Sequence, residues 1–164
     1  MKRITTFTFF IFIFIAFALP FLSECAFALK IPNGPFYAVK IKKSFKRAYF
    51  DLNQAVIAEN FTVAAATPIS KGLKMFGFKI SKLEVLDLCN ASIGYDLLKH
   101  DMNYAALMPC RIAIYKKGRH HVVIIAFLPS YFMHYFKNNK TTVKAALKAT
   151  KKLIRIINSV KTGF

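Results

Sequence analysis

The stretch from residue 83 to residue 128 constrains the fold most, because three β-type runs follow one another closely there. Apolar runs at 83–88, 111–115 and 121–127 have the length of strands and are bounded by polar or glycine-containing turns. The Lys117-Gly118 step between the last two runs is typical of a hairpin. This region therefore predicts neighbouring antiparallel strands.

The rest of the chain adds two strands and two long helices. The patterns at 36–41 and 61–67 predict strands, and Pro68 ends the second. Apolar residues recurring three and four apart predict a helix that starts at Phe45 and is capped by Ser44. The same spacing predicts a C-terminal amphipathic helix, capped by Thr141 or Thr142 and extending to Val160.

Two further segments are less regular. Glycines interrupt residues 69–80, which predict a loop that includes one helical turn, and residues 92–100 predict a short helix. The chain shows no repeat and no second core. Residues 36–162 therefore predict a single two-layer α+β domain: a mostly antiparallel sheet of about five strands with helices packed on one face, plus the C-terminal helix.

The first residues have the pattern of an export signal. Lys2 and Arg3 precede an apolar run at 4–19, and Ala26-Phe27-Ala28 offers small residues at a cleavage site. We expect residues 1–28 to be a signal peptide that is cleaved near Ala28, which places the protein in the periplasm or outside the cell. The alternative is an uncleaved helix anchored in the inner membrane, although the apolar run is shorter than the roughly 20 residues of a membrane span.

The chain is strongly basic, with 25 Lys and Arg against 7 Asp and Glu and a net charge of +18. Such a charge favours anionic partners. For an exported protein these are anionic membrane surfaces, and no nucleic acid is expected. The basic face of the C-terminal helix is the candidate contact, and the alternative is a solvated face on a core-packed helix. Its members are Lys144, Lys148, Lys151, Lys152 and Arg155.

The two cysteines outside the signal segment lie at corresponding strand ends, with Cys89 closing one strand and Cys110 opening the next. In an oxidising compartment they form a candidate disulfide, worth about 3 kcal/mol for a loop of this length. The alternatives are two inert core thiols, or a thiolate site for a soft metal ion or haem. Met133 and His134 are the weaker candidates for a metal or haem ligand.

The residues around this corner resemble the bacterial family catalogued as domain of unknown function 302. The resemblance runs through Leu88-Cys89-Asn90 and the Leu107 to Tyr115 segment, and it covers about Tyr37 to Pro129. Ala91 and Asn60 depart from the family's usual Pro and Gly. The resemblance implies a compact α+β domain that often self-associates, here as a homodimer, and that has no settled activity.

No hydrolase, P-loop, metalloprotease or dinucleotide-binding motif is present in the sequence. The sequence therefore indicates an exported ligand-binding or structural module rather than an enzyme, with a redox, haem or metal protein as the alternative. Arg111 is expected to bind a small anionic ligand through its planar fork, or else to pair with Asp87 or Asp101. The candidate site consists of Cys89, Asn90, Pro109, Cys110 and Arg111.

Overall fold

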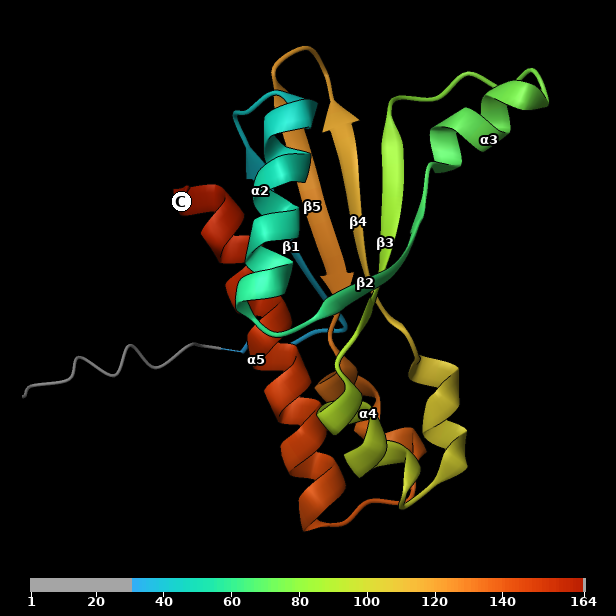
Figure 1. Ribbon diagram of the computed structural model, residues 1–164, viewed down its shortest axis with the longest axis vertical. Coiled ribbons are helices and arrows are strands. Elements are labelled where there is room, and N and C mark those ends of the chain that lie inside the picture. Colours follow the sequence, from blue (N-terminus) through green and yellow to red (C-terminus); the bar gives the residue numbers. More distant parts are fainter. Residues whose placement is uncertain (1–30, 164) are drawn as a thin grey trace, which may run out of the picture. The chain divides into compact units, whose positions relative to one another are not determined.

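The computed structural model describes residues 31–163, which form one antiparallel sheet with helices packed against it (Figure 1). The strand order across the sheet is β1-β5-β4-β3-β2, and every neighbouring pair is antiparallel. The sequence prediction of a five-stranded α+β fold is confirmed. The strands are β1 (Phe36–Ile41), β2 (Thr62–Thr67), β3 (Leu83–Cys89), β4 (Cys110–Lys117) and β5 (His121–Phe127).

Two long helices, α2 (Phe45–Ala58) and α5 (Lys140–Thr162), lie side by side on one face of the sheet (Figure 1). The shorter helix α3 (Ile69–Met75) belongs to the segment that connects β2 to β3 in the sequence. Helix α4 (Ala91–Leu98) follows β3 and packs against α5. Two 3-10 segments, η2 (Met102–Leu107) and η3 (Pro129–Tyr135), complete the fold near the end of the sheet where β3 finishes.

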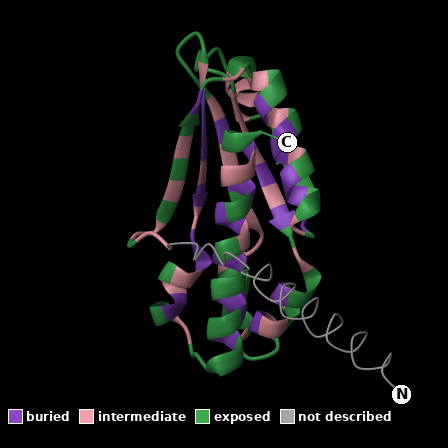
Figure 2. Ribbon diagram, turned by 90° about the vertical axis from the view of Figure 1, so that its left-hand side faces the viewer, coloured by how far each residue is buried: buried purple, intermediate pink, exposed green. Residues whose placement is uncertain are grey.

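The core lies between the sheet and the pair α2 and α5, and Figure 2 shows buried residues alternating with exposed ones along these elements. Alternate strand residues face the helices because side chains point to opposite faces of a strand. Each of these buried side chains contributes roughly 1.5–3 kcal/mol relative to its exposed state. The large, fully buried side chains of this core include Leu86, Leu88, Ile112, Ile114 and Ile124 from the sheet, Leu52 from α2, and Leu153, Ile156 and Ile157 from α5.

An ion-pair cluster ties the end of α2 to the middle of α5. Glu59, the C-cap residue of α2, accepts hydrogen bonds from Arg155 at 2.6 and 2.8 Å and from Lys152 at 3.1 Å. Lys152 also donates to the Glu59 backbone carbonyl at 2.6 Å. The Arg155 hydrogen bonds are the largest cause that lowers the pKa of the Glu59 carboxyl, and they outweigh its partial burial.

The structure differs from the sequence prediction in two local details. Residues 69–75 form the seven-residue helix α3, which is longer than the single helical turn expected there, although Gly72 within it costs about 1 kcal/mol relative to alanine. Helix α5 is capped by Asn139 rather than by Thr141 or Thr142. The Asn139 side chain accepts from the Thr142 backbone at 2.9 Å, and the Thr142 hydroxyl accepts from the Asn139 backbone, also at 2.9 Å.

Within residues 31–163, no helix has both the length and the apolar character that a bilayer span requires. The expected signal peptide and the alternative N-terminal anchor both fall on residues that lie outside the described part of the chain.

The Glu59 cluster predicts a pH-dependent contribution to stability. The pKa of the Glu59 carboxyl is lower in the folded state than in the unfolded state. The contribution of Glu59 to stability is therefore complete above the unfolded pKa and disappears as the pH falls through the folded pKa. Glu59→Gln should lower the free energy of unfolding by about 1–3 kcal/mol at pH 7, measured by urea denaturation. The difference from wild type should shrink in acid.

Glu84→Gln is the matched control, because its partner Lys82 lies 3.5 Å away and is exposed. It should change stability by less than about 1 kcal/mol. A Glu59→Gln deficit that stays constant into acid would contradict an electrostatic role for the cluster.

Candidate functional site

The two cysteines lie at the same corner of the sheet, as the sequence predicted, but their relative register differs. The ladder pairs Cys110 with Leu88, so Cys89 is displaced by one residue. Cys89 therefore stands one position past the pair formed by Leu88 and Cys110, and the two cysteines are not direct partners in the ladder. Cys89 is exposed, Cys110 is half-buried, and both are free thiols, so the structure does not contain the predicted disulfide.

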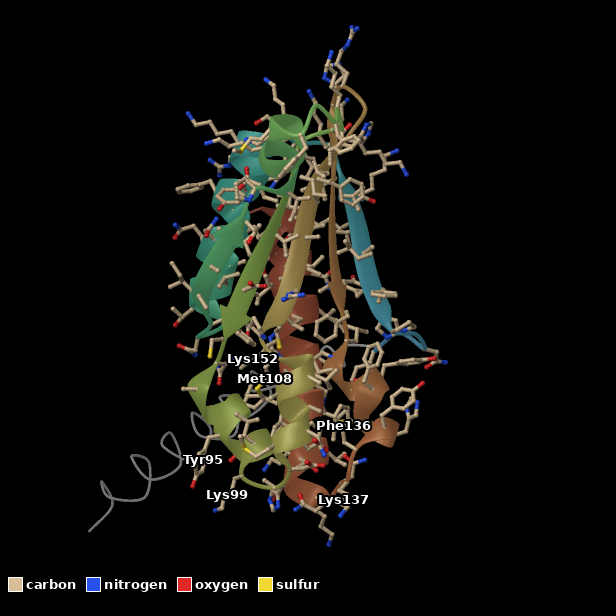
Figure 3. The ribbon with its side chains drawn as sticks, turned by 90° about the vertical axis from the view of Figure 1, so that its right-hand side faces the viewer. Tyr95, Lys99, Met108, Phe136, Lys137 and Lys152 are labelled. Atoms are coloured by element: carbon tan, nitrogen blue, oxygen red, sulfur yellow. The ribbon has the colours of Figure 1, made fainter. Side chains whose placement is uncertain are left out.

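A cavity of about 500 Å³ lies beneath this corner. Its walls come from the ends of β3 and β4, from α4 and η2, and from the N-terminal half of α5. Met108 lies at the junction between the end of the sheet and the α4–η2 segment (Figure 3). The lining is almost entirely apolar and includes Phe61, Leu88, Ile93, Leu97, Leu107, Met108, Met133, Ala146 and Ala149.

The few polar side chains in the wall are already engaged. The Asn90 side chain caps α4 by accepting from the Ile93 backbone at 3.1 Å, and it donates to the Asn60 carbonyl at 2.6 Å. The Tyr104 hydroxyl lies 2.7 Å from the Asn138 side-chain oxygen and 3.1 Å from the Lys137 carbonyl. Asn90 therefore holds α4 in place, and neither group is left to orient a polar ligand.

Sulfur is concentrated around the cavity. Cys89, Met108, Cys110 and Met133 all line it, from four different elements or connections. Burial, followed by the neighbouring Cys89, raises the pKa of the Cys110 thiol to about 11. At neutral pH Cys110 is therefore a neutral thiol, which suits an apolar wall.

Gly94 occupies the middle of α4, where glycine costs about 1 kcal/mol relative to alanine. An added Cβ would lie 3.9 Å from the methyl carbon of Met108, which is an ordinary contact. Gly94 also lines the cavity. Its missing side chain therefore leaves the cavity open at a point where a larger residue would fill it.

Arg111 does not join the other predicted site residues. Cys89, Asn90, Pro109 and Cys110 line the cavity, whereas Arg111 is exposed and donates to Asp87 at 3.0 Å. The alternative expectation of an Arg111 ion pair is therefore the one that the structure contains. Arg111 lines a second, more open hollow with Phe36, Phe127 and Phe132.

The remaining predicted residues are divided in the same way. Met133 faces the cavity, but His134 is exposed and lies against Tyr135 with ring centroids 3.9 Å apart. Over residues 31–163, no three His, Cys, Asp or Glu side chains are grouped so that they could hold a metal ion. On α5 the basic face is reduced, because two of its five members bind Glu59; Lys144, Lys148 and Lys151 stay exposed.

Segment η2 supplies cavity residues that the sequence analysis missed. It begins after Asp101, whose side chain accepts from the Asn103 backbone at 2.9 Å. Such a short 3-10 segment has no apolar periodicity to reveal it. The clue in the sequence was Tyr104, an aromatic residue among small ones, which is completely buried and stacks on Phe136 at 4.7 Å.

The family model described as "Domain of unknown function DUF302" matches residues 37–160. A crystal structure of an uncharacterized conserved protein DUF302 from Bacillus stearothermophilus is similar in fold, with a TM-score of 0.68 at 17% sequence identity. That similarity covers 75% of this chain and 95% of the other. No curated protein matches the chain.

Proposed function

Because the chain belongs to the DUF302 family, whose description gives no activity, we propose its function from the cavity: it is an exported module that binds a small apolar molecule. The observation that carries this proposal is a cavity of about 500 Å³ whose polar lining groups are already bonded. Its size lies in the range of small-molecule sites.

The chemistry of the wall defines the class of ligand. A charged or strongly polar ligand would lose its hydration without gaining partners, which costs several kcal/mol. An uncharged aromatic or aliphatic body loses little and gains contacts with the methionine and leucine side chains. The small anionic ligand that the sequence suggested for Arg111 would have to bind outside this cavity, because Arg111 does not line it. There Asp87 already neutralises the Arg111 guanidinium.

Binding rather than catalysis is the better fit to the lining. The described residues of the wall include no Asp, Glu, His or Lys, so an acid–base pair is missing there.

Export rests on the pattern of residues 1–28. The intact mass of protein from its native compartment should correspond to a chain beginning after Ala28, and the full-length mass would contradict cleavage.

Gly94 provides the test of the cavity. Gly94→Leu should fill the space next to Met108 and weaken binding of the uncharged fluorophore N-phenylnaphthylamine at least about tenfold. Gly94→Ala is the matched control. It should bind nearly as well as wild type and unfold with about 0.5–1 kcal/mol more stability. Equal affinity in wild type and Gly94→Leu would contradict the proposal.

A second candidate function is supported by the sulfur atoms of the lining. Two thiols and two thioethers around one cavity are ligands that select Cu(I). This retains the metal-binding alternative through Cys89 and Cys110, with Met108 and Met133 as further ligands. Binding would release the thiol protons, so the affinity for the ion should increase with pH.

Competition with bicinchoninate under anaerobic conditions measures this affinity. Replacing both Cys89 and Cys110 by Ser should abolish the transfer of Cu(I) from bicinchoninate to the protein. Met108→Leu should weaken the affinity of the protein for Cu(I) about tenfold. Met75→Leu on α3, outside the cavity lining, is the control. Transfer that survives the double cysteine variant would exclude this site.

A further inference from the structure

Residues 68–82, here called the arm, contain no buried residue. Helix α3 belongs to the arm and contains no buried residue. Three large apolar side chains at its end are exposed: Met75 by 81%, Phe76 by 79% and Phe78 by 63%. Figure 1 shows α3 projecting away from the layer formed by α2 and α5.

The arm has a defined geometry. At its base the Ser70 hydroxyl accepts from the Leu83 backbone at 3.1 Å and lies 3.3 Å from the Leu83 carbonyl. At its tip Gly77 has φ +85°, and the Gly77 and Phe78 amides donate back to the Lys74 and Leu73 carbonyls. This Schellman turn ends α3 and reverses the chain. The backbone that carries the exposed aromatics therefore has a fixed course.

The charge around these aromatics has a single sign. Residues 68–82 contain four lysines and no acidic residue. Lys71, Lys74 and Lys79 are exposed, next to the apolar tip. Lysine stems can pack along apolar material while the ammonium groups reach the polar layer above it. Exposed aromatics surrounded by lysines are the composition of a surface that binds anionic bilayers.

We propose that the arm is a membrane-contact site, in which Met75, Phe76 and Phe78 enter the interface of an anionic bilayer and the lysines bind lipid phosphates. A second copy of the chain is a poorer occupant, because two arms meeting at their tips would bring together lysines without an acid from either arm. The proposal is independent of the cavity. It places the contact on the arm rather than on the basic face of α5.

The absence of tryptophan from the chain gives a local probe. In full-length Phe76→Trp protein the tryptophan emission reports only on the arm. With vesicles containing phosphatidylglycerol, we expect a blue shift and quenching by brominated lipid, and we expect neither with phosphatidylcholine alone. The control is Tyr95→Trp on α4, a position that is 63% exposed. Its emission should stay unchanged, so attachment through residues 1–30 is distinguished from insertion of the arm.

Charge supplies the second part of the test. In the Phe76→Trp protein, replacing Lys71, Lys74 and Lys79 together by Glu should reduce vesicle binding at least about tenfold. The triple replacement of Lys144, Lys148 and Lys151 by Glu on α5 is the matched control, and it should leave the blue shift of the arm probe in place.

Three results would overturn the proposal. The first is an unshifted emission of the Phe76→Trp protein on anionic vesicles, and the second is an equal shift in the Tyr95→Trp protein. The third is a blue shift of the arm probe without vesicles that grows with protein concentration, which would show that a second copy covers the arm.

Discussion

The packing of α5 against the sheet is the constraint on which the rest of this structure depends. Helix α5 has 23 residues and the longest strand has 8, so the helix is longer than the strands by about 8 Å. One half of the helix covers the sheet. The other half extends past the cysteine corner, where α4 and η3 cover it, and Thr150 holds η3 by a 3.0 Å hydrogen bond to Ser130. The cavity lies where α5 changes from packing against the sheet to packing against α4 and η3.

The same arrangement explains why the cavity is apolar. Its walls are the extended faces of elements whose other residues form the core, so leucine, isoleucine and alanine continue from the core into the lining. The small side chains of Ala146 and Ala149, together with Gly94, leave space that larger residues would fill. Under the proposed function, recognition there would depend on shape and on sulfur contacts, because Asn90 and Tyr104 already use their hydrogen-bonding groups within the protein.

Periodicity in the sequence predicted all five strands, α2 and α5, since each is covered on one face and therefore has a regular apolar pattern. It also placed Cys89 and Cys110 at neighbouring strand ends. It did not determine their register, because a shift of one residue depends on how the connecting α4–η2 segment packs. For the same reason, the sequence pattern did not show that Arg111 lies outside the cavity lining. Segment η2 was missed and the length of helix α3 was underestimated, because neither shows a continuous apolar stripe.

The central claim is that an apolar space lies under the cysteine corner and is open to small apolar molecules. A crystal pressurised with xenon tests it directly, since xenon occupies dry apolar cavities without requiring hydrogen bonds. We predict a xenon peak in contact with Met108, Met133 and Leu97. A corner filled by ordered water, or one whose side chains close the space completely, would contradict the account.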